Sequence, residues 1–197
     1  DHDLLFILDE IQANLGRTGP MYAFTHYEVE PDIVLLGKGL ANGVPASAAV
    51  GRSDVFECLD FGEASDTWSA NPLSSAAVLA TLDEFEQNDV IAKGLELSAV
   101  IEAGLVRLKE TGVIANVRGE GCVWGIECAD IGDKPSGDVA NDVIRACYEG
   151  NAEGQAIHLL GALVGNVIRI SPPLTMNVEE CQHYLDVMYD ICQSLHE

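Results

Sequence analysis

The chain has 197 residues and a formal net charge of −22, because 32 Asp and Glu residues outnumber 10 Lys and Arg. Hydrophobic residues make up 48% of it, enough for a sizeable core, which excludes disorder as its main state. So acidic a chain is a poor match for phosphate backbones, so we expect no nucleic-acid partner. We also expect no membrane span, because the apolar runs are short, and no secretory signal, because no basic segment precedes an apolar one.

The acidic residues are scattered along the whole chain rather than gathered in a tail. This distribution predicts an acidic surface kept in solution by self-repulsion and tolerated where salt screens it. It suggests the hypothesis of a salt-adapted, halophilic source. An ordinary acidic bacterial protein is the alternative.

The cysteine and histidine patterns give no sign of a metal site. None of the six cysteines forms a CxxC pair, and the five histidines show no ligand spacing. We therefore expect free, mostly buried thiols in a reducing compartment, and a cytoplasmic protein without metal.

Short apolar runs alternate with helical patterns in the first half of the chain. The expected strands are residues 4–8, 33–36 and 46–50, of which 4–8 is predicted to be buried on both faces, as in a parallel sheet. The expected helices are residues 53–59, 73–86 and 89–111, with Pro72 in the first turn of the second and Gly112 ending the third. Because the chain begins three residues before an expected central strand, we expect that upstream sequence is missing.

From residue 114 onward, the sequence predicts paired strands followed by helices. The expected strands are 114–117, 122–128 and 167–170, the first two paired around residues 119–121, and the expected helices are 138–148 and 178–195. Asn177 is predicted to cap the last helix. The apolar stretch 156–164 fits neither class. We place a domain boundary near Glu110, which gives units 1–110 and 111–197.

Two candidate functional residues follow neighbouring strands. Asp9 and Lys38 each stand at the carboxyl end of an apolar strand, where α/β sheets bind ligands. A Lys amine in a water-poor crevice is a candidate for Schiff-base chemistry, and a carboxylate can keep a pyridine nitrogen protonated. Pyridoxal phosphate enzymes need this pair of groups. By pattern alone, however, a lysine that follows a strand is usually a surface lysine.

The sequence itself resembles one family. Residues 5–52, LFILDEIQANLGRTGPMYAFTHYEVEPDIVLLGKGLANGVPASAAVGR, resemble the signature segment of the class III aminotransferases, with DEIQ, GRTG, EPDIVLLGKGL and NGVP in the family's order. The later segments DTWSANPLSSAAVLATLDEFE, VRGEGCVWGIE and VIRISPPLTMNVEE are similar too. The resemblance implies an α/β fold of fold type I. Residues 1–110 would be the C-terminal part of the large cofactor domain, with its mixed or parallel sheet, and residues 111–197 a small α+β C-terminal domain.

The resemblance also implies roles for individual residues. Lys38 would form the Schiff base with pyridoxal 5'-phosphate and act as the catalytic base, and Asp9 would pair with the pyridinium nitrogen. Gln12 would lie near the phenolic oxygen of the cofactor. Thr67 would bind the cofactor phosphate of a neighbouring subunit, which implies a homodimer with shared sites. Arg169 would hold a substrate carboxylate.

Plain structural alternatives remain for three of these residues. Gln12 could be a polar loop residue, Thr67 an N-cap of the helix that follows it, and Arg169 a surface strand residue. We expect Glu10 and Arg17 to be structural.

The implied activity is transfer of an amino group from an amino acid to a 2-oxo acid in ping-pong order. The donor would be an ω-amino acid such as 4-aminobutyrate, or ornithine or acetylornithine. Gln12 argues against the diaminopelargonate-forming and semialdehyde-mutase branches. A decarboxylating transaminase, an amino-acid racemase and a catalytically silent fragment are the alternatives.

The chain also departs from the family pattern. It lacks the family's Gly-Ser/Thr phosphate loop and the aromatic residue that stacks on the pyridine ring. It carries Trp68, Ser69 and Ala70 where the family often has aromatic, Gly and Gly residues. We therefore expect the isolated chain to bind the cofactor poorly.

Overall fold

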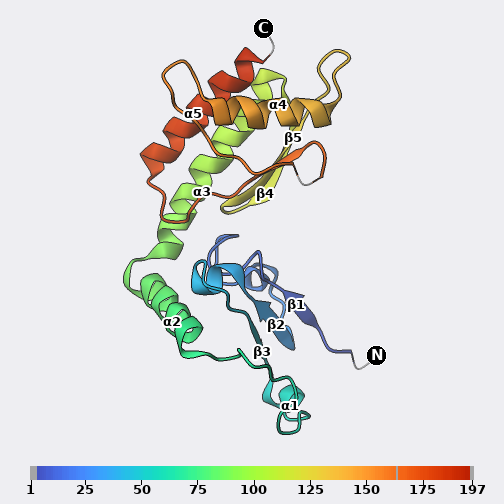
Figure 1. Ribbon diagram of the computed structural model, residues 1–197, viewed down its shortest axis with the longest axis vertical. Coiled ribbons are helices and arrows are strands. Elements are labelled where there is room, and N and C mark those ends of the chain that lie inside the picture. Colours follow the sequence, from blue (N-terminus) through green and yellow to red (C-terminus); the bar gives the residue numbers. More distant parts are fainter. Residues whose placement is uncertain (1–3, 163, 196–197) are drawn as a thin grey trace. The chain divides into compact units, whose positions relative to one another are not determined.

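A computed structural model describes residues 4–162 and 164–195, and the chain divides into two compact units, Asp1–Ile91 and Ala92–Glu197 (Figure 1). The division lies near the start of helix α3 (Val90–Arg107), earlier than the residue 110 expected from the sequence. The physical reason is that three apolar residues of α3, Leu97, Ile101 and Leu105, are buried in the core of the second unit. Most of this helix therefore belongs with the strands that follow it.

The first unit is built on a three-stranded mixed sheet in the order β1–β2–β3. Its strands are β1 (Ile7–Asp9), β2 (Ile33–Leu36) and β3 (Ala48–Gly51). Strand β1 runs parallel to β2, with Asp9 opposite Leu35, and β2 runs antiparallel to β3. The sheet is the mixed α/β type that the sequence predicts.

Helices complete the first unit. They are the 3-10 helices η1 (Ala23–Tyr27) and η2 (Lys38–Ala41) and the α-helices α1 (Ser53–Phe56) and α2 (Pro72–Gln87). Helix α2 packs on η2, and its apolar side chains cover a small core formed by Leu15, Val34, Leu36 and Leu40. The side chain of Asn71 caps α2 by accepting a hydrogen bond from the Ser74 N–H at 3.0 Å.

Strand β1 differs from the prediction. The sequence predicts that residues 4–8 are buried on both faces, but the strand has three residues, and Leu5, Phe6 and Ile7 are 57%, 44% and 50% exposed. The reason is that these side chains belong to neither core cluster of the described residues, so little of the described chain packs over them. The prediction that both faces of this segment are buried is therefore wrong, although the apolar run does contain part of a strand.

The second unit has an antiparallel sheet in the order β4–β5–β6. Its strands are β4 (Ile114–Glu120), β5 (Val123–Cys128) and β6 (Val167–Ile170). One face, which includes Ile126 and Ile168, packs against α3, α4 (Ser136–Glu149) and α5 (Val178–Ser194) (Figure 1). The opposite face carries Arg118, Glu127 and Arg169, because side chains alternate along a strand.

Helix ends in the second unit follow the sequence signals. Helix α3 continues into the 3-10 helix η3 (Leu108–Thr111), and Gly112 ends it in the left-handed conformation with φ 72°. Asn177 caps α5, because its side-chain oxygen accepts hydrogen bonds from the N–H groups of Glu179 at 2.8 Å and Glu180 at 3.2 Å. Residues 156–162 and 164 form neither helix nor strand.

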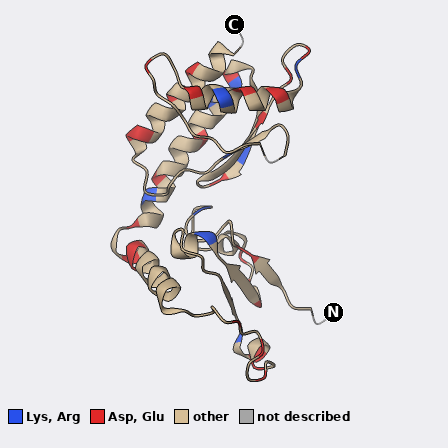
Figure 2. Cartoon of the chain, viewed as in Figure 1, with Lys and Arg blue, Asp and Glu red and all other residues tan. Residues whose placement is uncertain are grey.

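The acidic side chains are spread over the helices and loops of both units, and basic side chains are few (Figure 2). All six cysteines are free thiols; Cys58 is exposed and the other five are buried. Among the described residues, no group of three or more His, Cys, Asp or Glu side chains could hold a metal ion. None of the described helices is long and apolar enough to cross a membrane.

Candidate functional site

Asp9 and Lys38 lie at the same edge of the first sheet. Asp9 is the last residue of β1, and Lys38 begins η2 two residues after the end of β2. Because β1 and β2 are parallel neighbours, their carboxyl ends meet at one edge, where α/β sheets bind ligands. Both side chains are exposed. The structure therefore provides a carboxylate and an amine on adjacent strand ends.

The backbone of Lys38 is in an uncommon conformation. Its φ is +47°, in the left-handed region, which costs a residue with a side chain roughly 1–2 kcal/mol. Such a conformation persists only where the surroundings hold it. Here Leu40 and Ala41, two and three residues further along, are buried, and the Leu40 N–H donates to the Gly37 carbonyl at 3.1 Å.

Asp9 is oriented by its own turn, because its Oδ1 accepts a hydrogen bond from the Ile11 N–H at 2.9 Å. The adjacent Glu10 has a different role. Glu10 is buried, and its carboxylate accepts hydrogen bonds from the N–H groups of Ala23 at 2.9 Å and Phe24 at 2.6 Å. Both its oxygens are thus engaged by backbone, which is the structural role expected from the sequence.

Gln12 is exposed in the turn that follows β1, so it lies on the same segment as Asp9. Thr67 is exposed in the loop before α2. In that loop the Ser69 hydroxyl and the backbone N–H groups of Trp68 and Ser69 donate to the Asp66 carboxylate, and they lower the pKa of Asp66. The N-cap alternative for Thr67 is wrong, because Asn71 caps the helix.

Arg169 belongs to the second unit, on β6 opposite Gly125 of β5. Its Nε is buried without a hydrogen-bond partner, and no salt bridge among the described residues includes it. By contrast, Arg118 on the same face of the sheet pairs with Glu127 at 2.7 Å. An uncompensated guanidinium in a chain of charge −22 is suited to an anion from outside the chain.

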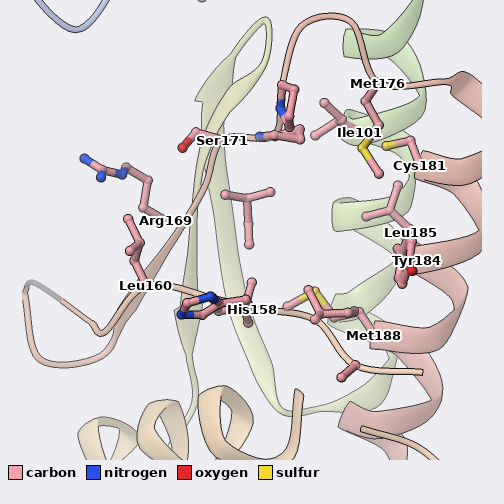
Figure 3. Close-up of a pocket in the computed structure, with 16 residues that line it drawn as sticks. Ile101, His158, Leu160, Arg169, Ser171, Met176, Cys181, Tyr184, Leu185 and Met188 are labelled. Atoms are coloured by element: carbon pink, nitrogen blue, oxygen red, sulfur yellow. The ribbon is translucent and has the colours of Figure 1, made fainter. Parts of the chain in front are cut away.

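A pocket of about 400 Å³ lies beside Arg169, between β6 and α5 (Figure 3). Its lining is mostly apolar, with Ile170, Met176, Leu185 and Met188 among its residues. In Figure 3 the guanidinium of Arg169 extends away from α5, so the charged end does not point toward the helix side of this pocket. The pocket therefore presents mainly apolar surface, and the charged end of Arg169 points away from α5.

Sequence reasoning missed one polar residue next to Asp9 and Lys38 in the first unit. Asn14 is buried, and its Nδ2 donates to the carbonyls of Glu10 at 2.7 Å and Gly37 at 3.4 Å. Local sequence marks Asn14 only as a turn residue. Its bond to Gly37 spans 23 positions, so no local pattern could have found it.

Comparison with known proteins gives one family. The family model "Aminotransferase class-III" matches residues 1–192. The chain is 36% identical over 177 residues to an acetylornithine aminotransferase of Bacillus subtilis, covering 89% of this chain and 42% of that protein. It is 32% identical over 189 residues to an alanine/serine racemase of Pyrococcus horikoshii, covering 95% of this chain and 39% of that protein.

The solved structures that resemble the chain include aminotransferases as well. An ornithine aminotransferase from Toxoplasma gondii ME49 superposes with a TM-score of 0.85 at 31% identity, covering 98% of this chain and 44% of that one. An acetylornithine aminotransferase from Elizabethkingia anophelis also gives 0.85, at 29% identity and covering 98% and 46%. The chain thus spans less than half the length of these relatives. By the match over residues 1–192, the chain belongs to the class III aminotransferases, a family dependent on pyridoxal phosphate.

Proposed function

We propose that this chain carries the lysine-bearing part of a pyridoxal phosphate-dependent aminotransferase. The observation that supports it best is the pair formed by Asp9 and Lys38 on adjacent parallel strand ends, with Lys38 in a left-handed backbone conformation. Such outliers cluster at functional sites. The two groups also fit the cofactor chemically, since its carbonyl needs an amine and its pyridine nitrogen a carboxylate.

Each residue has a proposed task. When bound, the cofactor supplies an electron sink for the bonds at the carbon that carries the amino group. The Lys38 amine would hold the cofactor through its carbonyl, with loss of water, and, once displaced by the substrate amine, would be free to move the proton on and off the substrate carbon. Asp9 keeps the pyridine nitrogen protonated, and its bond from the Ile11 N–H fixes the direction of one oxygen. Gln12 lies in the same turn and is assigned to the phenolic oxygen.

Thr67 and Arg169 have separate proposed tasks. Thr67 is assigned to the cofactor phosphate of a second subunit in a homodimer, and its exposure in the loop before α2 is compatible with that contact. Arg169 is assigned to a substrate carboxylate, because its guanidinium lacks a carboxylate partner among the described residues. A guanidinium binds such a group through two parallel hydrogen bonds.

The amino donor is proposed to be an ω-amino acid such as 4-aminobutyrate, or ornithine or acetylornithine, with a 2-oxo acid as acceptor. Relatives named 4-aminobutyrate aminotransferase and acetylornithine aminotransferase support this, at 32% and 36% identity. Amino-acid racemisation is the second candidate, since relatives named alanine/serine racemase and leucine/methionine racemase match at 32% and 34%.

The test uses the complete protein that contains this chain. Incubation with pyridoxal phosphate should give the visible absorption band of a cofactor–lysine adduct, and borohydride trapping with peptide mass spectrometry should place the adduct on Lys38. Lys38→Ala should abolish the band and activity. Lys93→Ala, which removes an exposed lysine of α3, should leave both unchanged. Persistence of the band in Lys38→Ala would contradict the assignment.

Two further measurements separate the candidate reactions. A panel of amino donors with 2-oxo acid acceptors detects transamination, and single enantiomers without acceptor detect racemisation.

The role of Arg169 is tested by substitution. Arg169→Gln should raise KM for carboxylate-bearing substrates. If it changes no kinetic constant with any of them, Arg169 does not bind the substrate carboxylate.

A further inference from the structure

Buried polar side chains are rare in the part of the chain that the structure describes. They are Glu10, Asn14 and Thr111, and the first two lie in one turn that directly follows Asp9. A polar group is kept in the interior only where hydrogen bonds satisfy it. The Glu10 carboxylate is satisfied by the N–H groups of Ala23 and Phe24 in η1, whereas the Asn14 amide bonds outside that helix.

Asn14 joins the two strand ends. Its side-chain amide has two hydrogens, and Nδ2 has two acceptors, the carbonyl oxygens of Glu10 at 2.7 Å and of Gly37 at 3.4 Å. Glu10 is the residue after Asp9, and Gly37 is the residue before Lys38. One amide group therefore bonds to the backbone on either side of the proposed catalytic pair.

The turns that this amide joins are in direct contact. A Cβ at Gly37 would lie 3.3 Å from Cγ2 of Ile11, and a Cβ at Gly39 would lie 3.7 Å from Oδ1 of Asn14. The two neighbours of Lys38 thus rest against the turn formed by residues 10–15. Ile11 and Asn14 of that turn therefore leave little room beside the two neighbours of Lys38.

We propose that Asn14 is a positioning residue that sets the spacing between the Asp9 carboxylate and the Lys38 amine. It holds the Glu10 and Gly37 carbonyls to one amide and so keeps Lys38 in its left-handed conformation. The role of Asp9 and Lys38 rests on the proposed function. The hydrogen-bonded link between their turns exists without any cofactor and is testable by itself.

The first experiment needs no cofactor. Asn14→Asp has the same shape but replaces two donors with acceptors facing two carbonyl oxygens. Because the Leu40 N–H donates to the same Gly37 carbonyl at 3.1 Å, its hydrogen exchange reports on this turn. Asn14→Asp should speed exchange at Leu40 by about tenfold, the size expected from losing one buried hydrogen bond. Asn14→Ala, which adds no charge, should act in the same direction if Asn14→Asp fails to fold.

The matched control is Asn88→Asp, which makes the same chemical change at the exposed end of α2. It should leave exchange at Leu40 unchanged. Exchange at Leu40 that is equal in wild type, Asn14→Asp and Asn14→Ala would overturn the proposal, whatever the cofactor experiments show.

The second experiment uses the complete protein with pyridoxal phosphate. Asn14→Ala should slow attachment of the cofactor to Lys38 and lower kcat by about tenfold, with KM for the amino donor within about twofold. A change in KM alone would contradict a positioning role. If the wild type itself attaches no cofactor at Lys38, the proposed function fails, and exchange at Leu40 still decides whether Asn14 links the two turns.

Discussion

Arg118 donates a hydrogen bond to the Glu127 carboxylate across β4 and β5, with an Nη1–Oε2 distance of 2.7 Å. This bond is the main reason why the pKa of Glu127 lies below its ordinary value of 4.5. The pair stands on the same sheet face as Arg169. It neutralises one arginine there and leaves the other available.

The depressed pKa of Glu127 predicts a pH dependence of stability. Because the folded-state pKa is lowered, the contribution is fully present above about pH 4.5 and is lost as the pH falls through the lower, folded value. Glu127→Gln should lower the urea midpoint at neutral pH, and the difference from wild type should vanish in acid. Glu120→Gln, in the same hairpin, is the control. A deficit in Glu127→Gln that is constant with pH would contradict the ion-pair explanation.

Two glycines of α3 should respond oppositely to alanine. A Cβ at Gly104 would lie 2.6 Å from Cδ1 and 3.0 Å from Cβ of Leu185 on α5, so Gly104→Ala should destabilise by about 1–3 kcal/mol. A Cβ at Gly94 meets only Leu174, at 3.7 Å. Gly94→Ala should therefore stabilise by up to about 1 kcal/mol through helix propensity. Chemical denaturation measures both, and equal shifts in one direction would show that α3 and α5 do not approach this closely.

Adjacent residues of α3 test the core. Leu105 is fully buried, and Leu105→Ala should cost about 2–5 kcal/mol of unfolding free energy, since it leaves a cavity among packed side chains. The next residue, Val106, is 50% exposed, and Val106→Ala should change stability by less than about 0.5 kcal/mol. Similar costs at both positions, measured by urea denaturation, would mean that the buried face of α3 is assigned incorrectly.

The thiols should react at two very different rates. Burial raises the pKa of Cys128 to about 11 and that of Cys147 to about 12, and it also raises the pKa of Cys181 and Cys192. The reactive form is the thiolate, so an aromatic disulfide reagent should titrate Cys58 quickly in the native chain and all six thiols after denaturation. Cys58→Ser should remove the fast phase. Fast reaction of more than one thiol would indicate that the second unit opens.

Local sequence signals predicted most helices and strands well. Pro72, Gly112 and Asn177 each mark a helix end in the structure, because capping and backbone preference depend on neighbouring residues alone. The exposure of residues 4–7 was not predictable, since burial depends on which other segments cover a strand. The two-unit division likewise depends on which core α3 packs into.

The candidate site shows the same contrast. Asp9 and Lys38 could be placed at strand ends from sequence, and the parallel pairing of β1 and β2 brings those ends to one edge. Their roles and those of Gln12, Thr67 and Arg169 come from the family resemblance and stay predictions. Asn14 could not be found, because its partner Gly37 is distant in sequence and the contact exists only once both turns have folded.

The exposed edge of β1 has a consequence for how this chain behaves in solution. It presents apolar side chains from Leu4 to Ile7 beside backbone groups that no described strand occupies, which is a template for pairing with another extended segment. The charge of −22 opposes such encounters, and salt weakens that opposition. Raising the salt concentration should therefore weaken the charge repulsion between chains and favour pairing along this edge.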